Sequence, residues 1–249
     1  MLPNSILPDE ELTDLCINHW KVLQKKQGFR FSIDAVLLAH FIQPKAGQQL
    51  LDMGTGSGVI PLLIAARHQQ VTIDGIEVQP AIAEMAQRSV LYNGQQERIT
   101  IRQQDLTQLP KDYARKYDWV VSNPPFFPIG SGKFSPNSQM AMARHEVGCT
   151  LDDVVKSASY CVKDRGHFAM IHRAERLPEI LSTCQKYNLA PYRLRMVQPT
   201  AAQPANLLLL ECIYQGRNRL TVLPPLVVYH QNHTYTEEIL EYYKNNSSA

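Results

Sequence analysis

The sequence has few cysteines, and their spacing excludes two kinds of site. No two of the five lie in a Cys-x-x-Cys pair, so neither a zinc knuckle nor a disulfide framework is predicted. We expect reduced thiols, as in cytosolic proteins. Histidines near the C-terminus and in the central part of the chain lack the further ligands of a metal site. The sequence therefore predicts no metal. The cysteines are Cys16, Cys149, Cys161, Cys184 and Cys212.

Long hydrophobic runs and a large excess of one charge are also missing. Apolar runs such as "VIPLLIAA" fall far short of the ~20 residues that cross a bilayer. The acidic N-terminus lacks the basic and apolar regions of a signal peptide. Twenty-five Lys and Arg against 23 Asp and Glu give a net charge of +2, which permits a nucleic-acid partner without indicating one. We expect a soluble, cytoplasmic protein with no membrane partner.

What the sequence does contain is an alternation of short apolar runs with helical patterns. This alternation is typical of βαβ units and predicts an α/β fold with a mostly parallel sheet. The two last strands follow each other directly and are expected to be antiparallel. Residues 128–149 show no clear period and are expected to form a long loop. The predicted strands are 49–53, 71–78, 98–105, 117–123, 166–172, 191–199 and 206–215, and the predicted helices 58–68, 80–94, 150–162 and 176–188.

A glycine-rich turn follows the first predicted strand. In "LDMGTGSG", Asp52 ends the strand and Gly54, Thr55, Gly56 and Gly58 lead into a helix. Glycines there permit a tight turn and a close approach of the backbone to a ligand. The dinucleotide fingerprint G-x-G-x-x-G fits poorly, because the third glycine comes one residue early. The turn suits the amino-acid part of S-adenosylmethionine, whose ammonium group needs an anion and backbone carbonyls.

Two further acids end the next two predicted strands. Glu77 can accept hydrogen bonds from two ribose hydroxyls, as in dinucleotide sites. Asp105 can accept from the adenine amino group, although a solvated turn acid is a real alternative at that position. We include the residues that follow them, Val78 and Leu106, in the predicted cofactor site. Three acids at the ends of three successive strands are hard to explain by packing.

The fourth predicted strand ends in "VVSNPPFF". The Asn123 amide oxygen and the Pro124 carbonyl could hold both hydrogens of a planar amino group, with Pro125 and Pro124 fixing the direction of the carbonyl. The nitrogen could then become pyramidal and expose its lone pair. Phe126 would stack on a base. Catalysis would then rest on alignment, without a strong general base. The alternative is that a buried strand simply ends in a rigid turn.

These residues resemble the class I methyltransferases with an Asn-Pro-Pro-aromatic motif. More narrowly, "GFRFSIDAVLLAHF", "DMGTGSGVIPLLIAAR", "VSNPPFF", "ARHEVGCTLDDVV" and "HQNHTYTEEI" are similar to the bacterial tRNA1(Val) (adenine-37-N6)-methyltransferase family, in its Gram-positive-like branch. The resemblance implies a Rossmann-like, seven-stranded sheet with an antiparallel final hairpin, S-adenosyl-L-methionine as donor, and adenine N6 in RNA as acceptor. It also implies that Phe31, Ser32 and Asp34 help to close the cofactor site.

Domain organisation follows from the same reading. Residues 1–46 contain two apolar-periodic pieces split at Gly28, the second with Ser32 placed as a helix N-cap. They are too short for an independent domain, and we expect an extension that lids the sheet. Residues 47–249 are expected to form the methyltransferase domain.

Other functions and weaker sites stay open. Phe126 stands where many relatives have Tyr, so a guanine-N2 methyltransferase is an alternative. A protein glutamine-N5 methyltransferase is a second alternative. It shares the Asn-Pro-Pro-aromatic motif but typically carries a longer N-terminal helical domain. An RNA-binding module on a methyltransferase scaffold is the non-enzymatic alternative. RNA, most simply tRNA, is the expected partner, and no obligate protein partner is predicted. Candidate phosphate contacts are Lys133, Arg144, Arg193 and Arg195, and ordinary surface charge is the alternative interpretation of each.

Overall fold

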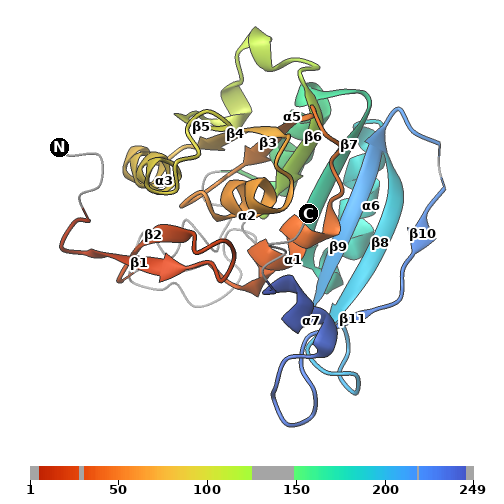
Figure 1. Cartoon of the computed structure of the whole chain (residues 1–249). Helices are drawn as coiled ribbons and strands as arrows, with labels where there is room; N and C mark the ends of the chain where they lie inside the picture. Colours follow the sequence, from red (N-terminus) through yellow and green to blue (C-terminus); the bar gives the residue numbers. More distant parts are fainter. Residues whose placement is uncertain (1–5, 28–30, 125–148, 218, 245–249) are drawn as a thin grey trace.

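The central sheet dominates the computed structural model, which describes residues 6–27, 31–124, 149–217 and 219–244. Its strands follow the order β10-β8-β9-β7-β6-β3-β4-β5, and β11 pairs with β8 (Figure 1). The pairs among β3 to β7 are parallel, whereas β9 is antiparallel to both β7 and β8. The strands are β3 (Gln49–Met53), β4 (Thr72–Glu77), β5 (Ile99–Gln103), β6 (Tyr117–Ser122), β7 (Val162–Arg173), β8 (Leu189–Gln198), β9 (Leu207–Tyr214), β10 (Thr221–Val222) and β11 (Leu226–Val227).

The predicted seven-stranded sheet with its antiparallel final hairpin is therefore confirmed, with two additions. Strands β10 and β11 extend the edge beside β8, and each has only two residues. A two-residue strand is too short to show an alternating pattern, and prolines 224 and 225 separate the two. Strand β7 also begins at Val162 rather than at the predicted residue 166, directly after the preceding helix.

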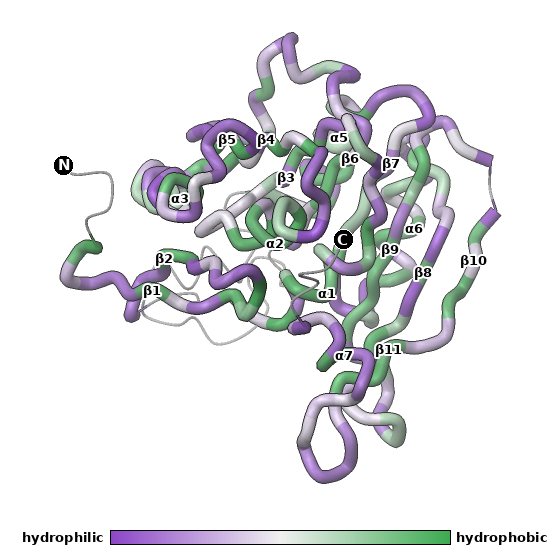
Figure 2. Tube along the Cα trace, in the orientation of Figure 1, coloured by the Kyte–Doolittle hydropathy of each residue, from purple (hydrophilic) through white to green (hydrophobic). Residues whose placement is uncertain are grey.

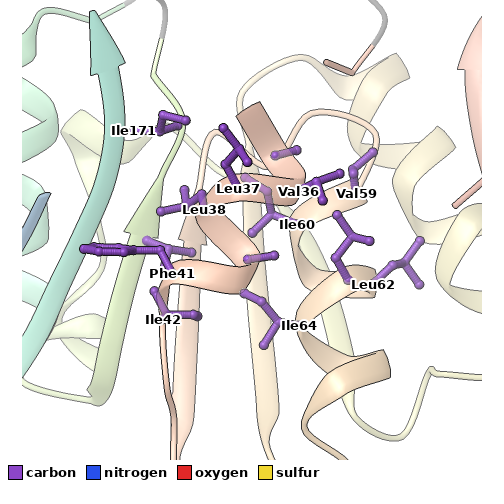
Figure 3. Close-up of a cluster of buried hydrophobic side chains, with 14 of the residues drawn as sticks. Val36, Leu37, Leu38, Phe41, Ile42, Val59, Ile60, Leu62, Ile64 and Ile171 are labelled. Atoms are coloured by element: carbon purple, nitrogen blue, oxygen red, sulfur yellow. The ribbon is translucent and has the colours of Figure 1, made fainter. Parts of the chain in front are cut away.

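Helices cover both faces of the sheet, which gives three layers. One buried cluster joins α1 (Ile33–Phe41), α2 (Val59–Arg67) and α3 (Pro80–Tyr92) to the sheet, and a second joins α5 (Leu151–Cys161) and α6 (Leu177–Lys186) to the opposite face. Figure 3 shows side chains of α1 and α2 packed together with Ile171 of β7. Apolar residues gather along α2 and β9, whereas the loop before α7 (Glu237–Tyr242) is hydrophilic (Figure 2).

Local sequence signals explain where these helices begin and end. Thr150 and Asp153 form a reciprocal capping box at the start of α5. Pro80 occupies the first turn of α3, and Gly94, with φ +65°, follows the end of that helix. The longest described helix, α3, has 13 residues, and none of the described helices has the length and apolarity that a membrane span requires.

The N-terminal segment is a hairpin followed by a helix. The part of the chain before Gly28 contains β1 (Glu10–Asp14) and β2 (Lys21–Lys25), paired antiparallel, and β1 begins before the first apolar-periodic piece. Side chains of α3 and of its C-cap residue hold the free edge of β2: the Leu23 amide donates to Ser89 Oγ (3.0 Å), and the Lys21 amide donates to Asn93 Oδ1 (2.9 Å). The carboxylate of Glu10 in β1 accepts a hydrogen bond from each terminal nitrogen of Arg88, both at 2.7 Å. The hairpin is thus fixed to α3, while its role as a lid stays a prediction.

The Glu10–Arg88 pair should contribute most of the attachment. Glu10 is 2% exposed, whereas Glu84, the other carboxylate on Arg88, has a side chain that is 53% exposed. Breaking a buried pair costs about 3 kcal/mol or more, and an exposed pair contributes less than about 1 kcal/mol. We therefore expect Glu10→Gln to lower the free energy of unfolding in urea several times more than the matched control Glu84→Gln.

The same pair predicts a pH dependence. The Arg88 guanidinium lowers the pKa of Glu10 to about 2 from an ordinary value of 4.5. The stabilisation is therefore complete above about pH 5 and is lost as the pH falls toward 2. In Glu10→Gln the acid-induced loss of stability should be smaller than in the unsubstituted protein. Equal urea midpoints for the two variants at pH 7 would contradict this account of the attachment.

Candidate active site

Strand register brings the ends of three neighbouring strands to one level. Met53 of β3 lies opposite Ile76 of β4 on one side and Ser122 of β6 on the other. The Ser122 hydroxyl also donates to the Met53 carbonyl at 2.9 Å, which ties β6 to β3 at this point. Since the strands are parallel, the residues that follow are neighbours at the carboxyl edge of the sheet. These residues are Gly54, Glu77 and Asn123.

The glycine turn folds back over the end of β4. The backbone amides of Gly54 and Thr55 both donate to the Ile76 carbonyl, at 3.0 and 2.9 Å. Gly54, Gly56 and Gly58 have φ of +73°, +55° and +84°, in the left-handed region that glycine adopts freely. A Cβ placed on Gly54 or Gly56 would meet nothing within 4 Å. The turn therefore requires glycine for its backbone and leaves open space in front of it, at the start of α2.

Asp52 beneath the turn is a buried acid without a partner. It is 0% exposed, and among the described residues no group forms a hydrogen bond of normal geometry with either carboxylate oxygen or with the Thr55 hydroxyl. Burial raises the pKa of Asp52 to about 7; the nearby Thr55 hydroxyl opposes the rise and the charge of Glu77 adds to it. A carboxylate in this position is stabilised by a cationic ligand. It fits the ammonium group that the sequence motif predicts.

Glu77 is oriented by the backbone around it. Its Oε2 accepts from the Gly56 amide at 3.1 Å and its Oε1 from the Gln79 amide at 3.0 Å. The side chain is nearly buried, and a carboxylate can accept about four hydrogen bonds, so two remain for a ligand. The next residue, Val78, is 48% exposed although it is apolar. An oriented acceptor thus lies beside an exposed apolar side chain.

Asp105 follows β5 and caps the short helix η1 (Leu106–Gln108). Its Oδ1 accepts from the amide and the hydroxyl of Thr107, both at 2.8 Å, and its Oδ2 has a long contact of 3.4 Å with Gln108. The turn role that the sequence left open is therefore present. Oδ2 still has capacity for an amino group. Leu106 is half-buried, and its carbonyl accepts from Ser157 Oγ at 2.8 Å, which joins this loop to α5.

We call residues 123–126, which follow β6, the reactive corner. The structure describes Asn123 and Pro124 of this corner. Asn123 is half-buried and Pro124 is buried. Both follow β6 beside the glycine turn, as the parallel register requires. The other predicted residues of this region lie outside the described residues: Pro125, Phe126, Lys133 and Arg144.

Helix α1 begins near the same edge. Phe31 is partly buried against the core, and Ser32 occupies the N-cap position, but its hydroxyl forms no capping hydrogen bond. Burial raises the pKa of Asp34, while the Ser32 hydroxyl and the positive charge of Arg173 act in the opposite direction. The first turn of α1 therefore lies within electrostatic reach of Arg173, at the end of β7. The sequence reading missed Arg173, whose signal is a basic residue directly after the fifth predicted strand.

Arg193 and Arg195 are engaged inside the protein. Arg193 pairs with buried Glu211 at 2.5 Å and donates to the Phe41 carbonyl at 3.2 Å. Arg195 forms a bidentate pair with Glu238 at 2.6 and 2.8 Å. These contacts join β8 to β9, α1 and α7. A phosphate would have to compete with these carboxylates. Among the described residues, no cluster of three metal-binding side chains occurs.

Comparison with known proteins shows which family the chain belongs to. The family model described as "Methyltransferase small domain" matches residues 30–172. The chain belongs to this methyltransferase family. A relative from Porphyromonas gingivalis, named tRNA1(Val) (adenine(37)-N6)-methyltransferase, is 33% identical over 176 residues, which cover 68% of each chain. A relative of the same name from Parabacteroides distasonis is 30% identical over 190 residues, which cover 76% of this chain and 79% of that one.

Solved structures show the same fold. A predicted O-methyltransferase from Agrobacterium tumefaciens superimposes with a TM-score of 0.69 at 22% identity, covering 84% of this chain and 95% of that one. Geranyl diphosphate C-methyltransferase from Streptomyces coelicolor, solved with S-adenosyl-L-homocysteine, gives 0.54 at 13% identity, covering 72% and 78%. The fold is that of the class I methyltransferases. With the family model and the relatives, it makes this methyltransferase an S-adenosyl-L-methionine-dependent enzyme.

Asp52 predicts opposite effects on stability and on cofactor binding. An acid whose pKa is raised to about 7 in the folded protein destabilises it at pH 8, where the carboxylate is ionised. Asp52→Asn removes this charge and should raise the free energy of unfolding without ligand by about 1–3 kcal/mol at pH 8. The same variant should bind S-adenosyl-L-methionine at least about tenfold more weakly in calorimetry.

The pH dependence supplies the control for this prediction. In the unsubstituted enzyme, affinity for the cofactor should fall as the pH drops below about 7, because protonated Asp52 no longer attracts an ammonium group. Asp52→Asn should show no such fall. Unchanged cofactor affinity in the variant would refute the role given to this carboxylate.

Proposed function

We propose that this enzyme transfers a methyl group from S-adenosyl-L-methionine to the N6 nitrogen of an adenine in tRNA. The relatives named as tRNA1(Val) (adenine(37)-N6)-methyltransferases support the substrate class. The observation that carries the proposal is the register that sets Asn123 beside the glycine turn, above the unpartnered Asp52. The proposal includes the Gram-positive-like branch, the Asn-Pro-Pro-Phe motif, a role in tRNA modification and a cytoplasmic location.

The glycine turn would hold the amino-acid part of the cofactor. In this proposal Asp52 pairs with the ammonium group, and the turn of Gly54, Thr55, Gly56 and Gly58 lets the backbone approach closely. The open space in front of Gly54 and Gly56 supports this assignment. Amide groups at the start of α2 favour an anion, which suits the cofactor carboxylate.

The next two strand ends would hold the nucleoside part. Glu77 accepts from the two ribose hydroxyls, using the capacity that its two backbone contacts leave. Val78 and Leu106 pack against the adenine ring. Asp105 accepts from the adenine amino group through Oδ2, while Oδ1 keeps its capping contacts with Thr107.

The strand β6 corner would hold the acceptor amine. The lone pair of an exocyclic adenine nitrogen is delocalised into the ring, which makes the nitrogen a poor nucleophile. Asn123 Oδ1 and the Pro124 carbonyl accept its two hydrogens and favour a pyramidal nitrogen. When bound, S-adenosyl-L-methionine supplies an electrophilic methyl group on its sulfonium. Alignment supplies much of the rate enhancement, and Pro125 and Phe126 complete the corner by fixing the carbonyl and stacking on the base.

The start of α1 would close the cofactor site. Phe31, Ser32 and Asp34 precede or begin the helix, and the hairpin in front of them is fixed to α3. In this proposal residues 1–46 act as an extension over residues 47–249. The Ser32 hydroxyl makes no capping hydrogen bond and interacts instead with Asp34, so these two polar groups lie together at the start of the helix.

Product analysis tests the acceptor. The enzyme is incubated with labelled S-adenosyl-L-methionine and, separately, with tRNA, rRNA and protein extract, and the products are digested and identified. We expect N6-methyladenosine from tRNA. N2-methylguanosine or methylglutamine as the main product would replace the proposed acceptor with one of the two alternatives, and no product at all would support a binding module.

Asn123 separates binding from chemistry. Asn123→Ala should leave the calorimetric affinity for S-adenosyl-L-methionine within about twofold, because the cofactor is held mainly by β3 and β4. Methyl transfer should fall by at least about 100-fold, as for loss of a group that acts on the transition state. Ser122→Ala, which changes the neighbouring buried residue, serves as a control for local disturbance. Loss of cofactor binding and activity together in Asn123→Ala would argue against the assigned role.

A further inference from the structure

Several basic residues lie near the carboxyl edge of the sheet, and those nearest to Asn123 are at the end of β7. Among the described lysines and arginines, four lie at or within three residues of a carboxyl-edge strand end: Arg102 of β5, Arg173 at the end of β7, Arg176 after it, and Arg195 of β8. Of these strands only β7 is next to β6, so Arg173 and Arg176 are the two that lie near Asn123. Arg176 is 10% exposed and pairs with Glu179 through two nitrogens, at 2.8 and 2.7 Å. Arg173 has a side chain that is 33% exposed, and its Nε lies 3.8 Å from exposed Glu175. Arg173 is therefore the more accessible cation.

Arg173 also lies close to the reactive corner. Ser122 of β6 pairs with Met170 of β7 in a parallel register. In this parallel register Asn123 follows Ser122 at the level of Ile171, and Pro124 follows at the level of His172. Arg173 therefore lies about one residue beyond the level of Pro124. Adjacent strands are about 4.8 Å apart. A guanidinium group at this place can reach a nucleotide whose base lies at the corner.

The charge of Arg173 also acts on the start of α1. Its positive charge opposes the effect of burial on the pKa of Asp34, so it is within electrostatic reach of that carboxyl. Arg193 and Arg195 on β8 each pair with a carboxylate at 2.5–2.6 Å. Both lie on a strand that is separated from β6 by β9 and β7, whereas Arg173 lies at the carboxyl edge, on the strand next to β6. Guanidinium groups are well suited to phosphate, which they bind through two parallel hydrogen bonds.

We infer that Arg173 binds a backbone phosphate of the RNA next to the nucleotide that is methylated. The inference rests on the proposed RNA substrate and adds a positioning contact to it. Because a phosphate contact carries no sequence information, Arg173 fixes the position of the nucleotide rather than the identity of its base. It forms no contact with the reacting atoms, and it is not a catalytic residue.

The variants are Arg173→Ala and a matched control, Arg219→Ala. Arg219 is exposed and precedes β10, which pairs with β8 at Arg193, five residues before the end of that strand. Both substitutions remove one positive charge, but only Arg173→Ala removes it from the carboxyl edge of the sheet. Binding of an unmodified tRNA transcript is measured by filter binding at several salt concentrations, with S-adenosyl-L-homocysteine present. Cofactor affinity is measured separately by calorimetry.

We expect Arg173→Ala to weaken tRNA binding about tenfold at 0.1 M salt and to make the slope of log K against log salt shallower by about one unit. Cofactor affinity should stay within about twofold. Arg219→Ala should match the unsubstituted enzyme in both measurements. Arg173→Lys keeps the charge and should have the salt slope of the unsubstituted enzyme. Arg173→Gln removes the charge and should have the shallower slope. These two variants replace Arg173→Ala if that variant does not fold.

Two results would overturn the inference. An unchanged salt slope in Arg173→Ala or Arg173→Gln would show that Arg173 does not bind a phosphate of the RNA. Weaker cofactor binding in parallel with weaker tRNA binding would assign Arg173 to the cofactor carboxylate or to the α1 lid. Failure of the proposed function is separate, because it would appear as the absence of N6-methyladenosine in tRNA with the unsubstituted enzyme.

Discussion

The buried carboxylate of Asp52 is the constraint on which the rest of the site depends. It lies on the central strand β3 between β4 and β6, where water cannot solvate it, and its burial raises its pKa to about 7. An unpartnered buried acid lowers stability, so two well-packed faces of the sheet must offset its cost. The tight glycine turn next to it leaves open space in front of Gly54 and Gly56, where we propose that the ammonium group of the cofactor binds.

Parallel strands explain why the functional groups gather although they are far apart in the sequence. Each of β3, β4, β5 and β6 ends at the same edge, and each contributes one polar group there: Asp52, Glu77, Asp105 and Asn123 (Figure 1). Contacts across the strands then adjust their orientation. The Glu77 carboxylate is aimed by the amides of the glycine turn, and the Ser122 hydroxyl fixes the end of β6 to β3.

The elements that position the site could be predicted because their signals are local. Alternation of strands and helices, glycines at the turn and the capping residues of α3 and α5 each act within a few residues. The hairpin β1–β2 could not be predicted in the same way, because Ser89, Asn93 and Arg88 of a distant helix hold it in place. The short strands β10 and β11 depend in the same way on the exposed edge of β8.

Charge is the property that sequence spacing described least well. Arg193 and Arg195 stand two residues apart on one strand and look like a phosphate strip, but Glu211 and Glu238 reach them from other elements. A net charge of only +2 gives weak long-range attraction of a nucleic acid, so the proposed recognition of RNA would depend on a few contacts close to the reacting base. The folded chain uses its β8 arginines to join β8, β9, α1 and α7. If the substrate is RNA, as proposed, a cation at the carboxyl edge beside Asn123 and Pro124 therefore contributes more to binding near the reacting base than several cations along the side of the sheet.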